Sequence, residues 1–255
     1  MKKIIAPFIL LILALVVASC HTRYVITDIT RTRIVVDERY DAHPDAAAET
    51  FVKPYQHEVD SLMMPVVGQV SLYMRAHRPE SELSNLLADI LLWSGKAYNE
   101  SPDFSVYNMG GIRAALAKGP VNLGNVNDVA PFDNKIFFLT LTGDKVLELF
   151  TQIAKRGGEG VSHGVELEIS KDGKLNKARL NGEEVATNKS YRVATLDYLA
   201  SGNDGLSAFN YKTDVKSPQG DGDNVRVLIA NYFRDNSGKG IVVNGKVEGR
   251  IKVVN

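Results

Sequence analysis

Apolar side chains recur at helical spacing in four segments, each of which we expect to form a helix with one apolar face. The segments lie at about residues 45–64, from residue 81 onward, at about residues 143–156 and at about residues 223–234. Ser81 and Thr142 stand where N-caps belong, and Gly157 follows the third segment as a C-terminal stop. Pro54 falls inside the first segment, so we expect it to kink or restart that helix.

Strands are expected between these helices and in the C-terminal half. Apolar runs cover residues 66–72, 104–107 and 135–141, and apolar positions alternate over residues 165–169 and 191–195. Hairpin turns are predicted at Asp172-Gly173, Asn181-Gly182 and Asn244-Gly245. Residues 21–43 are polar and β-branched, and they predict a tether that ends in a strand. The whole pattern favours a single α/β domain of the α+β type over residues 45–255, with helices layered on mixed sheets.

The first twenty residues have the pattern of a secretion signal. Lys2 and Lys3 precede an apolar run of 14 residues, 4–17, whereas a membrane-spanning helix needs about 20. The run closes with Val-Ala-Ser-Cys at residues 17–20, which resembles a bacterial lipobox. That resemblance implies a signal peptide at residues 1–19, a lipid on Cys20 and a lipidated tether over residues 20–44. The chain is then expected in the bacterial cell envelope, periplasmic or surface-facing, anchored to a membrane by its acyl chains.

Composition and charge narrow the range of functions. Lys plus Arg and Asp plus Glu number 30 each, so no overall charge points to nucleic acid. One cysteine and five scattered histidines give no internal disulfide and no expected metal or cofactor site in this chain. The sequence has neither a Gly-x-Ser-x-Gly nucleophile motif nor a phosphate-binding loop. Asp41 and His43 have the Asp-x-His spacing of a dimetal site. Such a site needs more ligands, so we interpret both as loop and N-cap residues.

Three turns are the segments best suited to hold a ligand. Asn108, Gly110, Gly111 and Arg113 follow the strand at 104–107. The glycines allow a close approach of the backbone, and the arginine suits phosphate or carboxylate. Residues 130–134, Ala-Pro-Phe-Asp-Asn, precede the strand at 135–141, and residues 194–205 run from a strand through an aromatic into an acidic, glycine-rich turn. Each turn alone is as typical of a structural turn as of a binding site.

Taken in order, the motifs resemble the C-terminal domain of the 5′-nucleotidase / UDP-sugar hydrolase family. The resemblance covers about residues 79–209 and rests on residues 80–89, 108–113, 131–134 and 191–205, with Thr-Gly at 142–143. Ser84 and Asn203 each replace a glycine of the family. We expect the second turn to survive because asparagine tolerates left-handed backbone. Two arginines that some members carry upstream have no secure counterpart, Arg75 and Arg78 being only nearby.

The resemblance implies a nucleotide site. Phe132 and Tyr198 would clamp the base between two rings, and Asn134 would reach the base edge. Asp204 would accept hydrogen bonds from ribose hydroxyls, and Arg113 would lie near the phosphate. The resemblance also implies ligand contacts from the glycine turn, by Asn108, Gly110 and Gly111, and from the loop at residues 160–164, by Gly164.

Family hydrolases hold two metals in an N-terminal metallophosphoesterase domain, for which the residues before Glu80 leave no room. We therefore expect the substrate-recognition domain of a split 5′-nucleotidase, with the divalent metals in a separate metallophosphatase chain. Two alternatives stay open. One is an interaction lipoprotein that keeps only the fold, in which Phe132 and Tyr198 pack inward or do not face each other. The other is a hydrolase that acts on nucleotides by itself.

Overall fold

The computed structural model describes residues 24–254, so the predicted signal peptide and the lipidation site at Cys20 lie outside the described residues. Residues 24–51 and residues 52–254 form two units, which are treated separately. In the first unit, residues 24–36 have no regular structure, and one 3₁₀ helix, η1, follows at Glu38–Tyr40. The strand predicted at the end of the tether is therefore wrong. A strand is held by the hydrogen bonds of a neighbouring strand, and the described part of the chain offers this segment none.

Helix α2 spans Ala46–Met63 and differs from expectation in two ways. Its N-cap is Asp45, whose Oδ1 accepts the N–H groups of Ala47 and Ala48 at 2.9 and 3.1 Å. Asp41 and His43 lie in the loop before it, so they do not cap it. The helix also runs through Pro54 without restarting, and its apolar stripe is exposed. No helix among residues 24–254 is long and apolar enough to cross a membrane.

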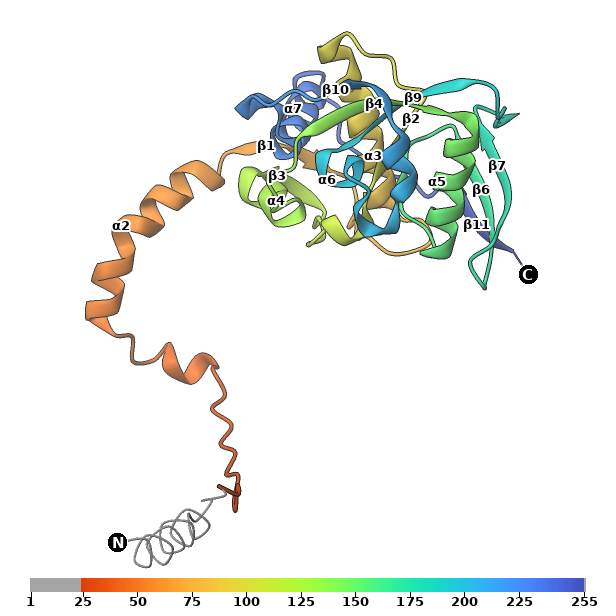
Figure 1. The fold of residues 1–255 in the computed structure, drawn as a ribbon. Coiled ribbons are helices and arrows are strands. Elements are labelled where there is room, and N and C mark those ends of the chain that lie inside the picture. The colour runs from red at the N-terminus through yellow and green to blue at the C-terminus, as the bar shows by residue number, and fades with distance from the viewer. Residues whose placement is uncertain (1–23, 255) are drawn as a thin grey trace, which may run out of the picture. The chain divides into compact units, whose positions relative to one another are not determined.

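The fold of residues 52–254 is mixed α/β, as predicted, and is built on three sheets (Figure 1). The central sheet has the order β10-β4-β9-β2-β5, in which β2 and β9 are parallel and the other pairs are antiparallel. Its strands are Thr213–Lys216, Ile136–Thr142, Ser190–Leu196, Phe104–Tyr107 and Gly160–Val161. A second sheet has the order β11-β6-β7-β8, with strands Ile251–Val254, Val165–Ser170, Leu175–Leu180 and Glu183–Glu184. The third pairs β1 with β3, at Val66–Val70 and Gly119–Asn122.

Helices cover these sheets and enclose the core. Helix α5 contacts both larger sheets, while α3 packs on β2 and α7 packs on β1 and α3 (Figure 1). The core contains fully buried aromatic rings from strands and helices, Phe104, Phe138, Phe150, Phe209 and Phe233. The helices are α3 (Glu82–Ser94), α4 (Leu123–Val129), α5 (Gly143–Lys155), α6 (Asp197–Ala200) and α7 (Val225–Gly238). Short 3₁₀ helices lie at Gly95–Tyr98 (η2), Met109–Gly111 (η3), Asn203–Gly205 (η4), Ser207–Tyr211 (η5) and Asp221–Asp223 (η6).

The predicted boundaries agree with these elements at most ends. Ser81 caps α3, and Ser84 completes a capping box with it, their hydroxyl oxygens being 2.8 Å apart. The serine that replaces a family glycine therefore stabilises the helix start. The dipeptides at 172–173 and 181–182 join antiparallel strands as predicted. The hairpin at Asn244-Gly245 is wrong, because this segment lies against α3 and any side chain at Gly245 would meet the Glu82 carbonyl.

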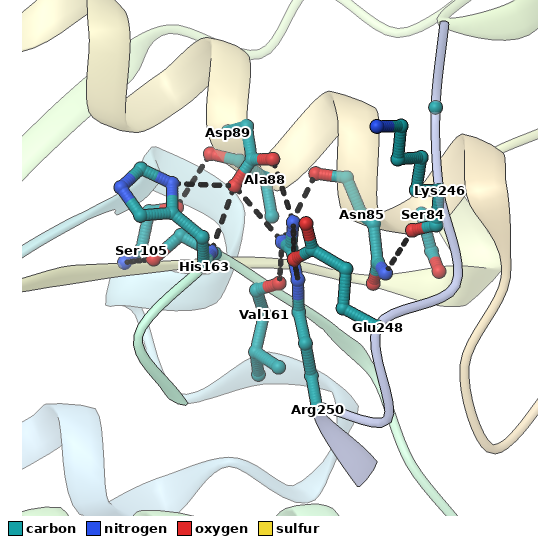
Figure 2. Close-up of polar contacts among 12 residues, drawn as sticks. Ser84, Asn85, Ala88, Asp89, Ser105, Val161, His163, Lys246, Glu248 and Arg250 are labelled. Atoms are coloured by element: carbon teal, nitrogen blue, oxygen red, sulfur yellow. Dashed lines mark hydrogen bonds and ion pairs between the residues drawn. The ribbon is translucent and has the colours of Figure 1, made fainter. Parts of the chain in front are cut away.

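The C-terminal segment is held by the first family motif (Figure 2). Oε1 of the buried Glu80 accepts the N–H groups of Glu248 and Gly249 at 2.8 and 3.2 Å. Asp89 takes both terminal nitrogens of the buried Arg250 at 2.9 and 2.7 Å. It also accepts the backbone N–H of His163 at 2.8 Å. These motif residues therefore join α3 to the chain's end, and we assign them an architectural role.

Candidate functional site

Seven of the nine predicted site residues border one pocket of about 210 Å³. They are Asn108, Gly110, Gly111, Phe132, Asn134, Tyr198 and Asp204. They come from three turns that are far apart along the chain, so the fold is what brings them together.

The sheet topology explains this convergence. Strands β4, β9 and β2 are neighbours, and β2 runs parallel to β9, so both have their carboxyl ends at the same edge. Strand β4 is antiparallel to β9, so it begins at that edge. Asn108 follows β2, Asn134 precedes β4 and Tyr198 follows β9. Ligands of open α/β sheets bind outside the carboxyl ends of strands, which is where this pocket lies.

Phe132 and Tyr198 remain accessible at the pocket. The two residues are 48% and 40% exposed, in contrast to the fully buried phenylalanines of the core. The interaction-lipoprotein alternative expects these rings to pack inward or not to face each other; both border the pocket, which disagrees with the inward packing. Helix α7 fixes the loop that carries Phe132 through two contacts. Asp133 forms an ion pair with Arg226, and the Val225 N–H donates to the Asn134 carbonyl at 2.9 Å.

Asp204 is the polar centre of the pocket. Its Oδ2 accepts a hydrogen bond from Nδ2 of Asn108 at 2.8 Å, and its Oδ1 accepts one from the Tyr198 hydroxyl at 3.2 Å. The negative charge of Asp204 is the main cause that raises the pKa of Tyr198 above its usual value. A tyrosine hydroxyl is protonated at neutral pH in any case, and here it serves as the donor. A carboxylate has about four acceptor positions, so Asp204 keeps capacity for ligand hydroxyls.

The turn that presents Asp204 differs in detail from the prediction. Gly202, Asp204 and Gly205 have left-handed backbone, with φ of 79°, 56° and 72°. Asn203 is not among the residues of positive φ. Its tolerance of left-handed backbone is therefore not what preserves the turn. The position does not require a glycine conformation, and the side chain donates from Nδ2 to the Tyr198 carbonyl at 2.8 Å.

Two predicted site residues lie outside the pocket lining. Arg113 is exposed, and its Nη1 donates to the carbonyl of Gly110, a residue of the pocket lining, at 3.4 Å. Gly164 lies just before β6 with φ of 85°, where a side chain would meet Asn181. The structure thus gives Gly164 a reason to be glycine that involves no ligand. The loop before it places His163 on Asp89 (Figure 2).

Sequence reasoning missed a charged group beside the pocket. Glu159 is buried, and its Oε1 pairs with Arg78 at 2.5 Å and with Arg156 at 2.6 Å. Its Oε2 accepts the N–H of Met109, the first residue of the glycine turn. Arg78, noted only as a nearby arginine, therefore belongs to this group. The sequence shows Glu159 only as an acidic residue flanked by glycines, and this pattern does not reveal that its partners lie far away along the chain.

A larger pocket of about 610 Å³ lies between α4, α7 and the end of α2. It contains none of the nine predicted residues and no aromatic ring, so the smaller pocket is the candidate ligand site. Within residues 24–254, no group of three or more His, Cys, Asp or Glu side chains is placed to hold a metal ion.

Comparison with known sequences agrees with this geometry. The family model described as "5′-nucleotidase, C-terminal domain" matches residues 66–211. The chain is 28% identical over 239 residues to the trifunctional nucleotide phosphoesterase protein YfkN of Bacillus subtilis, which covers 86% of this chain and 16% of that protein. It is 27% identical over 166 residues to protein UshA of Escherichia coli, which covers 64% of this chain and 30% of that protein. The chain thus spans less than a third of the length of either relative.

Solved structures share the fold. The 5′-nucleotidase precursor from Thermus thermophilus matches with a TM-score of 0.70 at 24% identity, over 82% of this chain and 43% of that chain. The sulfate thiohydrolase SoxB of Thermus thermophilus matches with a TM-score of 0.61 at 15% identity, over 84% of this chain and 40% of that chain. Proteins of different activity share this fold, so the likeness establishes the fold alone.

Proposed function

Because this chain belongs to the 5′-nucleotidase C-terminal domain family, we propose that it binds nucleosides or nucleotides and presents them to a separate metallophosphatase. The observation that carries the proposal is the pocket in which two half-exposed rings, Phe132 and Tyr198, border the same space as Asp204. That combination suits a flat heterocycle joined to a sugar with hydroxyl groups.

The chemistry of each wall supports this ligand class. Stacking of a base on an aromatic side chain contributes about 1–3 kcal/mol per base and tolerates any base. Asp204 would accept hydrogen bonds from the ribose hydroxyls, and the Asn134 amide would meet the base edge. Arg113 would lie near the phosphate, where an exposed guanidinium can form paired hydrogen bonds to its oxygens.

The second part of the proposal concerns catalysis and location. The phosphoester hydrolysis for which the 5′-nucleotidases are named would be supplied by a metallophosphatase chain that carries the divalent metals. Diacylglycerol on Cys20 would hold the protein at a membrane of the bacterial cell envelope, facing the periplasm or the exterior. A metallophosphatase encoded beside this gene and lacking a domain of this family is the first partner to test.

Isothermal titration calorimetry tests the binding step. The purified chain should bind adenosine, AMP or a UDP-sugar, and Phe132→Ala should weaken binding about 5- to 150-fold, the equivalent of one lost stacking contact. Tyr73→Ala removes another exposed aromatic and should leave the affinity unchanged. Absence of binding at millimolar ligand, or equal binding by the Phe132 variant, would overturn the proposal. Metal-dependent phosphate release from AMP by this chain alone, abolished by chelation, would contradict the separate partner.

A further inference from the structure

One buried carboxylate connects two walls of the pocket. The Glu159 side chain is fully buried. Its Oε2 takes the N–H of Met109, which precedes Gly110 and Gly111 on one wall. Its Oε1 takes Nε of Arg156 at 2.6 Å. The other end of that guanidinium, Nη2, lies 3.8 Å from Oδ2 of Asp204 on a second wall.

The charges around this connection are balanced. Two guanidinium groups, Arg78 and Arg156, face two carboxylates, Glu159 and Asp204. Arg78 is also fixed by its Nε hydrogen bond to the Gly158 carbonyl at 2.8 Å. A buried carboxylate is costly unless it is paired, so Glu159 depends on both arginines. Arg156 differs from Arg78 because it also faces Asp204, and it is the part of the group that reaches the pocket.

Asp204 has reason to need such support. Its φ of 56° lies in the left-handed region, which residues other than glycine adopt less readily. Its carboxylate is fixed on one side by Asn108 and on the other by Tyr198. Arg156 approaches Oδ2 at 3.8 Å as a third, charged neighbour that favours one orientation of the carboxylate.

We propose that Arg156, anchored by Glu159, is a positioning residue that orients Asp204 to receive the two vicinal hydroxyls of a ribose. The inference rests on the proposed function and extends it. It makes a residue outside the pocket lining responsible for the preference for ribosides over nucleosides whose sugar lacks these hydroxyls. Neither Arg156 nor Glu159 needs to touch the ligand for this role. Both act through Asp204.

A comparison of two ligands separates this role from a general structural one. Adenosine has the 2′ and 3′ hydroxyls, whereas 2′,3′-dideoxyadenosine presents the same base without them. Calorimetry on the full chain should show that Arg156→Gln weakens adenosine binding about tenfold, or about 1.4 kcal/mol, and dideoxyadenosine binding less than twofold. Arg156→Lys keeps a positive charge toward Asp204 and should recover most of the adenosine affinity. Arg234→Gln removes an exposed arginine elsewhere and should change neither affinity.

The two ligands distinguish a positioning role of Arg156 from a general structural one. Equal losses for both ligands, or no loss for either, overturn the positioning role while leaving the proposed function intact. If the unmodified chain binds AMP but neither nucleoside, this inference fails and the proposed function stands; if it binds none of the three, both fail. Glu159→Gln should reproduce the selective loss if the protein folds. If thermal denaturation shows that it does not fold, the Arg156 variants alone decide.

Discussion

The hydroxyl of Tyr198 donates a hydrogen bond to Oδ1 of Asp204 at 3.2 Å. The ring proposed to stack on a base is therefore tied to the carboxylate proposed to hold the sugar. Asn108 and Arg156 meet the other oxygen of the same carboxylate. Base and sugar recognition are thus joined through one side chain, and the predictions below separate their contributions.

Tyr198→Phe removes the hydroxyl and keeps the ring. We expect adenosine binding to weaken about two- to tenfold, because a single hydrogen bond contributes about 0.5–1.5 kcal/mol. Tyr198→Ala removes the stacking surface as well and should weaken binding further. Calorimetry of both variants provides the comparison. Identical losses in the two variants would show that the ring itself contributes nothing.

Arg113→Gln tests the proposed phosphate contact. The guanidinium is exposed, and its Nη1 is 3.4 Å from the Gly110 carbonyl. We expect AMP affinity to fall about two- to fivefold, in line with the loss of an exposed ion pair that contributes up to about 1 kcal/mol, while adenosine affinity stays the same. The difference should shrink at high salt, since exposed charges are screened. A loss that is equal for adenosine and AMP would refute a phosphate-specific role.

Asp89→Ala tests the architectural role of the first motif. The substitution leaves the buried Arg250 without the carboxylate that takes both of its terminal nitrogens. Arg250 keeps its ion pair with Glu248, so we expect the free energy of unfolding in urea to fall by about 1.5–3 kcal/mol, the order of a lost hydrogen bond between charged groups. His163→Ala removes an exposed partner of the same carboxylate and should cost less than about 1 kcal/mol. Comparable losses in the two variants would contradict the assignment.

The pair of Glu100 and Arg192 predicts a dependence of stability on pH. Hydrogen bonds from Arg192 hold the pKa of Glu100 below its ordinary value of 4.5. A carboxylate with a lowered pKa in the folded state stabilises the protein above its unfolded pKa, and that contribution disappears as the pH falls through the folded pKa. Glu100→Gln should therefore be less stable than the unmodified chain in urea at pH 7, with a smaller difference below pH 4.5. A difference independent of pH would argue against this coupling.

The seven predicted residues that line the pocket belong to local motifs next to strands, which the sequence shows directly. Asn108 follows one strand, Phe132 precedes another and Tyr198 follows a third. The motifs carry no information about which strands are neighbours. The convergence at one sheet edge therefore came from the family resemblance, and the topology now gives its physical reason.

Other features depend on long-range contacts that no local pattern records. Glu159 meets Arg78 across 81 positions and Met109 across 50. Asn244-Gly245 has the composition of a hairpin turn, but the glycine is needed for a close approach to α3. The left-handed residue other than glycine in the acidic turn is Asp204 rather than Asn203, and three distant or non-adjacent neighbours hold its side chain.

A crystal structure of the chain grown with saturating adenosine tests the central claim most directly. The account predicts the purine ring between the side chains of Phe132 and Tyr198, with the ribose hydroxyls within hydrogen-bond distance of Asp204. Adenosine bound elsewhere, or the two rings closed on each other in crystals that hold no nucleoside, would contradict it.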